Sequence, residues 1–271
     1  MYPVLFKLGK LQVHAYGLLL AVSFLFGILW AMKRGEKRGI SKDHVMDAGL
    51  YVVISAIFGS RLFYVITHLE EFRGRWLDTI NPFQSSGEIG IAGLSMLGGV
   101  VMAILTIIIF CRIKKIRILR FFDAATPSLA LGLALSRIGC FLNGCCFGKP
   151  GGLPWCVVFP DNSPAGVFLP GQHLHPTQIY SSIYDFLMLG AILWVDRKKQ
   201  PNGMLAAVFF VLYGVFRFLI DFVRYYESTV QFHILGAAFT FNQLIAALMT
   251  VTGLLLLWGI RRHKSEWEQK P

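Results

Sequence analysis

The chain has 271 residues, of which 55% are hydrophobic and only 15% are charged. A soluble domain carries roughly 25% charged residues, so the composition argues against a soluble protein and for a polytopic membrane protein. The net charge of +11 is compatible with a nucleic-acid partner, but its distribution along the chain predicts a membrane topology and no nucleic-acid binding.

Seven apolar segments are each close to the roughly 20 residues that a membrane-spanning helix needs. The first is long enough to be a full span, so we expect no cleaved signal peptide before it. The fourth is interrupted by Asp123 and Pro127. We therefore predict an all-α integral membrane protein with one membrane domain of seven transmembrane helices, at about 13–32, 45–66, 89–111, 119–135, 178–195, 204–222 and 240–260.

Basic residues gather in alternate connections between these segments. Residues 33–44 and 112–120 contain five Lys and Arg each, residues 196–203 contain three, and the tail after residue 260 contains four. These make 17 of the 26 basic residues, and the intervening connections contain two or fewer each. The positive-inside rule then predicts a cytoplasmic C-terminus and an N-terminus on the outer side.

With this topology, Arg61, Arg137 and Arg217 all fall in the outer half of the bilayer or at its outer surface. Arg61 and Arg217 lie inside the second and sixth spans, and Arg137 follows the predicted end of the fourth. A single arginine can snorkel to the interface. Three at similar depth indicate an anionic headgroup as ligand, because a guanidinium matches a phosphate well.

Arg217 also belongs to a polar stripe. Tyr213, Arg217, Asp221 and Arg224 recur at spacings of four, four and three residues, so they share one helix face. That face is expected to point into the protein, because lipid cannot solvate it. The alternative interpretation is an Arg217–Asp221 pair that only neutralises itself.

The predicted outer connection, residues 136–177, holds further polar candidates. It ends in a motif in which Pro176 is expected at the first position of the fifth span. Thr177 and Gln178 are then expected to cap the backbone N–H groups of that helix. In the third span, the small residues at 93–99 indicate close helix packing. The other candidates of the connection are Trp155, Asp161, Asn162, His173 and His175.

Four of the five cysteines, namely Cys140, Cys145, Cys146 and Cys156, also fall on the predicted outer side. An oxidising outer compartment favours one or two disulfides among them. Free packed thiols, or a zinc site with nearby histidines, are the alternatives. The cysteines lack the paired CxxC spacing of zinc ribbons, so no metal is predicted.

Several motifs together resemble one family, the prolipoprotein diacylglyceryl transferases. The resemblance covers nearly the whole chain and implies a bacterial cytoplasmic (inner) membrane enzyme with its active site toward the outer leaflet. It implies transfer of the diacylglyceryl group of phosphatidylglycerol to the lipobox cysteine of a prolipoprotein signal peptide, with a thioether formed and glycerol 1-phosphate released. No cofactor is implied. The matching motifs are Tyr16–Gly17, Gly59–Arg61, Gly93–Gly99, Arg137–Gly148, His175–Tyr180 and Tyr213–Arg217.

The resemblance also implies the site residues. Arg137 and Arg217 are the implied catalytic residues, and both are expected to bind the lipid substrate. The remaining residues implied to bind substrate or membrane lipid are Tyr16, Arg61, Asn143, Gly148, Gln178 and Tyr213.

The chain departs from the usual family pattern at five positions. Ser136, Cys140 and Cys145 stand where the family usually has Gly, Asn and Glu, while Leu97 replaces a His and Ser181 an acidic residue. A base, where one is required, would then be an outer histidine, and arginine-assisted ionisation of the acceptor thiol is the alternative. A divergent protein that binds or transports anionic phospholipid, or uses another acceptor, is the alternative function. The outer histidines are His14, His173 and His175, with His68 and His233 more distant.

Overall fold

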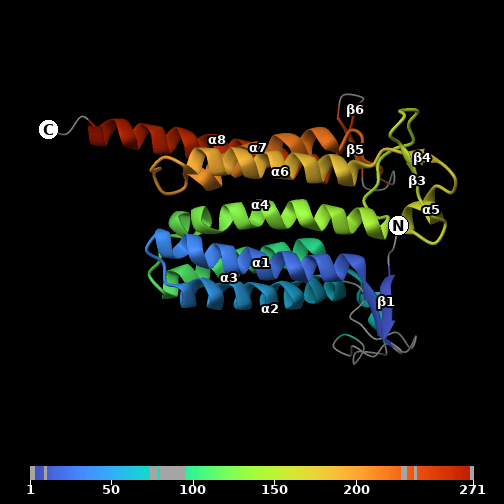
Figure 1. Ribbon diagram of the computed structural model, residues 1–271, viewed down its shortest axis with the longest axis horizontal. Coiled ribbons are helices and arrows are strands. Elements are labelled where there is room, and N and C mark those ends of the chain that lie inside the picture. The colour runs from blue at the N-terminus through green and yellow to red at the C-terminus, as the bar shows by residue number, and fades with distance from the viewer. Residues whose placement is uncertain are drawn as a thin grey trace. The chain divides into compact units, whose positions relative to one another are not determined.

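The computed structural model describes residues 4–8, 11–73, 79, 95–226, 231–234 and 237–268. The fold is built from helices, as predicted (Figure 1). Six are long and apolar enough to cross a membrane, among the residues described. These are α1 (Ala15–Lys37), α2 (Lys42–Thr67), α3 (Met96–Ile113), α4 (Ile118–Asn143), α6 (Thr177–Asp196) and α8 (Phe241–Glu268).

The remaining apolar helix, α7 (Met204–Ile220), has 17 residues. At 1.5 Å per residue it is roughly 26 Å long, slightly shorter than the roughly 30 Å of a hydrocarbon core. The six long helices match six of the predicted spans in position, and α7 matches the remaining one, the sixth, predicted at 204–222. Residues 89–94 of the predicted third span lie outside the described residues.

The fourth predicted span is one continuous helix despite its polar residues. The carboxylate of Asp123 is fully buried and accepts hydrogen bonds from the backbone N–H groups of Gly203 (2.7 Å) and Ala206 (3.0 Å). These N–H groups open α7, where they have no partner within the helix. The Asp123 carboxylate, which interrupts the apolar sequence of α4, thus caps the N-terminus of α7, where the helix dipole favours an anion.

Helix α4 also continues eight residues beyond the predicted end at residue 135, to Asn143. Arg137 and Cys140 are therefore helical residues, and not part of the following connection. They are three positions apart, so their side chains leave the same face of the last turns of α4.

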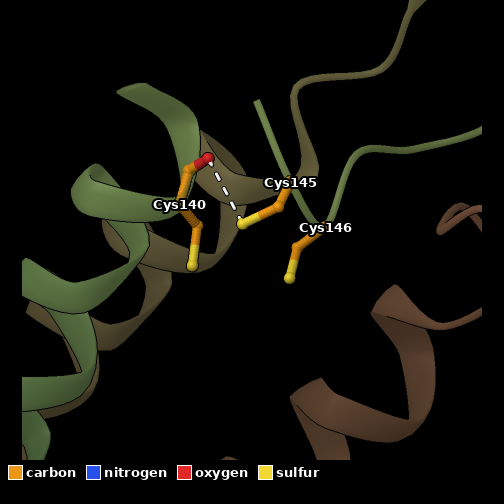
Figure 2. Close-up of side chains that lie close together, drawn as sticks. All are labelled: Cys140, Cys145 and Cys146. Carbon is orange, nitrogen blue, oxygen red and sulfur yellow. Dashed lines mark hydrogen bonds between the residues drawn. The ribbon is translucent and has the colours of Figure 1, made fainter. Parts of the chain in front are cut away.

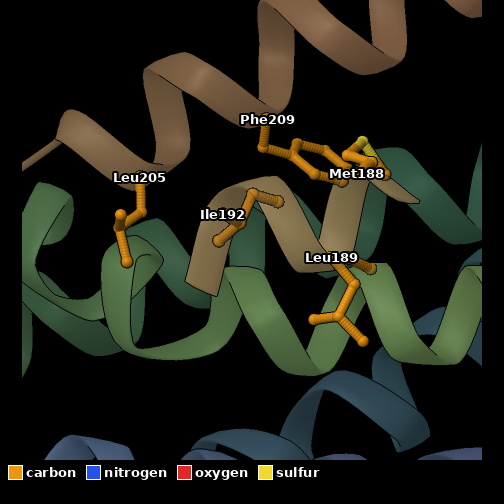
Figure 3. Packing of buried hydrophobic residues seen from close by; sticks show 6 residues of the cluster. Met188, Leu189, Ile192, Leu205 and Phe209 are labelled. Carbon is orange, nitrogen blue, oxygen red and sulfur yellow. The ribbon is translucent and has the colours of Figure 1, made fainter. Parts of the chain in front are cut away.

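By its internal contacts the chain divides into two compact units. The first comprises residues 1–7, 12–31 and 122–271. Its apolar core lies where α6 and α7 pack on α4, as Figure 3 shows. Gly214 and Gly253 bring α7 and α8 together: a Cβ atom on either would come within 2.9 Å of backbone on the opposite helix. The buried core residues are Ala130, Met188, Leu189, Ile192, Leu205 and Phe209.

The second unit comprises residues 8–11 and 32–121, and its centre is the pair α2 and α3. A Cβ atom on Gly59 would lie 2.7 Å from the carbonyl oxygen of Gly98. The backbone N–H of Ser95 donates to the carbonyl of Ser60 at 3.0 Å. Gly98 and Gly99 thus permit the close approach that the small residues predicted; Gly93 lies outside the described residues.

The outer connection of the prediction is a small folded element with its own core. It contains β3 (Val157–Val158), α5 (Pro164–Phe168) and β4 (His173–Leu174), and β3 pairs antiparallel with β4. Two further antiparallel pairs are present among the described residues: β1 (Val4–Leu8) with β2 (Leu11–His14), and β5 (Gln231–Ile234) with β6 (Ala237–Thr240). A 3-10 turn, η1 (Leu69–Phe72), follows α2.

Candidate functional site

The first unit gathers seven of the eight predicted site residues near the C-terminal end of α4. Arg137 projects from this helix and is half-buried. Its Nε atom is buried and has no hydrogen-bond partner among the described residues. An unpaired buried donor is costly. The Arg137 guanidinium is therefore available for a ligand that reaches this site.

Arg217, on α7, is held in a network of side chains. Its Nη1 lies 2.9 Å from Oδ1 of the fully buried Asp221, and its Nη2 donates to the hydroxyl of Tyr226 at 2.9 Å. The Tyr226 hydroxyl donates to the same Asp221 oxygen at 2.9 Å, and Thr240 donates to Oδ2 at 2.8 Å. Burial raises the pKa of Tyr226, so its hydroxyl keeps its proton as a donor.

The Arg217–Asp221 pair, weighed from the sequence as an alternative, is therefore present. The longer stripe is interrupted, because α7 ends at Ile220 and Arg224 lies beyond it. Arg224 instead pairs by a β-bridge with Gly148. Tyr213 stays on α7, stacked on Phe209 with ring centroids 5.5 Å apart.

Asp185 of α6 is a site residue that the sequence reasoning missed. Its side chain is 1% exposed, and its Oδ1 has no hydrogen-bond partner among the described residues. The carboxylate interacts electrostatically with both Arg137 and Arg217, and Arg137 also interacts with Tyr213. Asp185 thus lies within the electrostatic influence of two arginines that come from different helices. The available signal was its position, one helical turn after Ser181, where the family usually carries an acidic residue.

The segment after α4 is fixed by side chains from the start of α6. Gln178 donates from Nε2 to the carbonyl of Cys145 at 2.7 Å, and Thr177 donates to the carbonyl of Cys146 at 2.8 Å. The predicted capping role of these two side chains is wrong, because both donate to carbonyls of the preceding segment. Pro176 is the N-cap of α6 and not the predicted first helical residue. The Oε1 atom of Gln178 is buried without a partner among the residues described.

Gly148 sits where the backbone of this segment meets the His175 motif. Its N–H donates to the carbonyl of His175 at 2.9 Å. A Cβ atom at this position would lie 2.6 Å from the His175 Cβ and 2.8 Å from its carbonyl oxygen. The neighbouring Lys149 N–H donates to Val223 at 2.8 Å. Packing alone therefore accounts for Gly148, which is a structural part of the site.

The five cysteines are free thiols, so the disulfides favoured from the sequence are not present. Cys140, Cys145 and Cys146 converge, with their sulfur atoms all within 4.8 Å of one another (Figure 2). The Cys145 thiol donates to the Cys140 carbonyl at 3.7 Å and also bonds to the side chain of Asn143. Hydrogen bonds from the other two thiols lower the pKa of Cys146, and Arg224 and Arg137 act in the same direction.

Tyr16, near the start of α1, belongs to the same group. A Cβ atom on Gly139 would lie 3.3 Å from the Tyr16 Cα, so α1 approaches α4 closely at this level. The Tyr16 hydroxyl interacts electrostatically with Arg137 and with all three thiols. Tyr16 therefore joins Arg137, Asn143 and the cysteines at one end of the unit.

The comparisons with known proteins agree with this arrangement. Residues 3–259 match the family model for prolipoprotein diacylglyceryl transferase. The chain belongs to the prolipoprotein diacylglyceryl transferase family. A phosphatidylglycerol–prolipoprotein diacylglyceryl transferase of Clostridium tetani is 36% identical over 225 residues, which cover 83% of this chain and 86% of the relative. Those of Bordetella avium (33%; 97% and 96% covered) and Prochlorococcus marinus (31%; 95% and 90%) are similar over still more of the chain.

Arg61 is the predicted site residue that lies in the second unit. Its Nε donates to the carbonyl of Thr79 at 2.8 Å, and its guanidinium lies over the rings of Tyr64 and Phe72, 5.8 and 5.2 Å from their centroids. These contacts hold the side chain within its own unit. Lipid binding by Arg61 stays a prediction.

Three of the proposed histidines of the outer side are described. His68, in the second unit, is exposed and stacks on Tyr64 with ring centroids 4.2 Å apart. His175 is half-buried, and its Nδ1 lies 3.2 Å from the hydroxyl of Tyr180, which also accepts from the indole of Trp155 at 2.7 Å. His173 is exposed on β4. The side chains of His14 and His233 lie outside the described residues. Neither His173 nor His175 belongs to the group of thiols around Arg137.

Proposed function

We propose that the protein is a phosphatidylglycerol–prolipoprotein diacylglyceryl transferase. It transfers the diacylglyceryl group of phosphatidylglycerol to the lipobox cysteine of a prolipoprotein, forming a thioether and releasing glycerol 1-phosphate. Membership in the family supports this activity. The observation that carries it in the molecule is the buried Nε of Arg137, which has no hydrogen-bond partner among the described residues and lies, like Arg217, within the electrostatic influence of Asp185.

The reaction requires positive charge beside a phosphate, and two arginines supply it. The acceptor sulfur attacks the glyceryl carbon of the lipid, the C–O bond to phosphate breaks, and negative charge grows on the departing phosphate. Guanidiniums held in place before the reaction stabilise such charge most strongly where water is excluded. We assign this role to Arg137, with Arg217 as the second phosphate-binding group and Asp185 as a nearby carboxylate that offsets their positive charge before the lipid binds.

The remaining assignments concern the substrate and the membrane. Tyr16, Asn143, Gln178 and Tyr213 surround or brace Arg137 and are proposed to contact the headgroup or its glycerol, while Gly148 maintains the fold of the segment. Arg61, in the second unit, is also proposed to bind lipid.

Seven transmembrane helices with the N-terminus outside and the C-terminus cytoplasmic are proposed on the strength of the alternating basic connections. This topology puts the site toward the outer leaflet of a bacterial inner membrane, where the lipid enters sideways. The distribution of positive charge supports anionic lipid, and not nucleic acid, as the partner.

The test is complementation in bacterial cells depleted of their own transferase. We expect the wild-type chain to restore diacylglyceryl-modified prolipoprotein, and Arg137→Ala and Arg217→Ala to abolish the modification while still inserting into the membrane. Failure of the inserted wild-type chain to modify prolipoprotein contradicts the proposed activity. Modification that survives both substitutions contradicts the roles of the arginines.

A further inference from the structure

The three thiols of Cys140, Cys145 and Cys146 form a compact group at the end of α4. Their sulfur atoms are all within 4.8 Å of one another, and Figure 2 shows them converging on one space. Three sulfur ligands at about 2.3 Å from one zinc ion are roughly 3.8 Å apart. The thiols need to close by only about 1 Å, which side-chain rotation accommodates.

The backbone that carries these thiols is held from several directions. Gly144 (φ 72°) and Cys146 (φ 64°) adopt the left-handed conformation, which is uncommon for a residue other than glycine. The Cys145 N–H donates to the Cys140 carbonyl at 3.1 Å, and Thr177 and Gln178 hold the next two carbonyls from α6. A conformation with an energetic cost is thus imposed on Cys146 from outside, and it turns that thiol toward the other two.

We propose that these cysteines form a binding site for a thiophilic metal ion, specifically Zn²⁺, with three protein ligands and one open position. Thiolate sulfur is the ligand that selects soft and borderline cations such as zinc. Structural zinc sites have four protein ligands, whereas three protein ligands with a free position are typical of catalytic sites. Among the described residues, no histidine or carboxylate joins the group to close it.

The charges around the three thiols favour the binding of Zn²⁺. Three thiolates and Zn²⁺ sum to −1, and a fourth thiolate makes −2. Two guanidiniums, those of Arg137 and Arg224, interact electrostatically with the Cys146 sulfur. Both guanidiniums favour anionic ligands in the site, so the open position suits a thiolate ligand from a substrate.

This inference rests on the proposed function, in which the acceptor is a cysteine thiol. The acceptor sulfur binds the open position of Zn²⁺ and gives its proton to water, because a coordinated thiol is deprotonated. Its electron pair then forms the C–S bond to the glyceryl carbon, and the C–O bond to phosphate breaks with its pair left on the departing glycerol phosphate. Arg137, one helical turn from Cys140, is near both partners. The metal thus supplies the deprotonation of the acceptor thiol.

The first arm of the test measures metal alone. The purified full chain, reduced and stripped of metal, is titrated with Co²⁺, whose thiolate charge-transfer and d–d absorption bands report tetrahedral sulfur ligation. We expect one Co²⁺ per chain, displaced by Zn²⁺, and its loss in Cys146→Ser and Cys140→Ser. Cys156→Ser, a buried cysteine outside the group, serves as the matched control and keeps binding. Wild-type binding no greater than that of folded Cys146→Ser overturns the site.

The second arm adds the acceptor. A peptide with a lipobox cysteine is expected to shift the Co²⁺ bands, whereas the same peptide with serine leaves them unchanged; identical spectra with both peptides overturn the open position. Transfer by the zinc-loaded chain is expected to vary little from pH 6.5 to 8.5. In Cys146→Ser the transfer rate is expected to be about 100-fold lower or more. This remaining rate is expected to rise with pH toward the thiol pKa of about 8.5. Full transfer by metal-free Cys146→Ser overturns the role of zinc and leaves the transferase assignment intact.

Discussion

The substitution Asp221→Asn tests whether Arg217 is a buried charge held by a counter-charge. The Asp221 side chain is 0% exposed and the Arg217 side chain 15% exposed. The aspartate accepts from Arg217, Tyr226 and Thr240. The asparagine amide keeps one oxygen acceptor. Its N–H₂ group then faces at least one of the donors from Arg217, Tyr226 and Thr240. Removal of one partner of a buried pair costs about 3–5 kcal/mol, and we expect about 3 kcal/mol because Arg217 is partly exposed.

The assay is thermal unfolding of the purified protein in detergent, with and without phosphatidylglycerol. At roughly 2–4 °C per kcal/mol, Asp221→Asn should lower the midpoint by about 6–12 °C. Phosphatidylglycerol should restore more stability to the variant than to the wild type, because its phosphate supplies the missing negative charge.

The control is Glu36→Gln, which breaks a salt bridge of 3.1 Å to Lys42 between side chains that are 60% and 51% exposed. This exposed pair should contribute less than about 1 kcal/mol. Equal midpoints for Asp221→Asn and Glu36→Gln would refute the reasoning about Arg217. So would equal stabilisation of the variant by phosphatidylglycerol and by a zwitterionic lipid.

Three further predictions concern other parts of the first unit. Gly148→Ala should cost about 1–3 kcal/mol in thermal unfolding through overpacking against His175, while Gly152→Ala, where a Cβ atom meets nothing within 4 Å, should not; equal losses contradict the packing role. Asp123→Ala should cost about 1–2 kcal/mol by removing the cap of α7, and an unchanged midpoint would exclude that cap. Burial raises the pKa of Tyr226 above its ordinary value of 10.0. The protonated Tyr226 hydroxyl therefore contributes fully to stability below pH 10, and this contribution is lost as the pH rises through the raised pKa. Tyr226→Phe should therefore flatten the alkaline fall of the midpoint, and an identical pH profile would contradict the shift.

Much of the helix arrangement was predictable because it follows from composition and length. Apolar segments of about 20 residues have few other stable structures, so the helices lie where the hydropathy indicated. The Arg217–Asp221 pair was also visible, since residues four apart share a helix face. The end of α4 was not predictable, because Arg137 and Asn143 are polar, and a polar residue can end an apolar span without ending the helix.

The contacts that shape the site depend on tertiary structure. Asp123 interrupts the apolar sequence of a predicted span, yet its carboxylate caps a helix about 80 residues further along the chain. Gln178 looked like a capping residue, yet it binds the carbonyl of Cys145. Asp185 lies outside the matching motifs, and only its position one helical turn after Ser181 pointed to it. No local pattern reports such distant partners, and the convergence of three thiols likewise depends on how α6 holds the segment after α4.

The most direct measurement of the central claim is transfer by the purified protein in vesicles. Wild-type protein with phosphatidylglycerol and a lipobox-cysteine peptide should yield the diacylglyceryl thioether and one glycerol phosphate for each peptide modified. Arg137→Ala should lower kcat by at least about 100-fold, in line with loss of a group that stabilises developing charge, with its melting midpoint retained. Transfer by Arg137→Ala at the wild-type rate, or no thioether from the folded wild-type protein, would contradict the account.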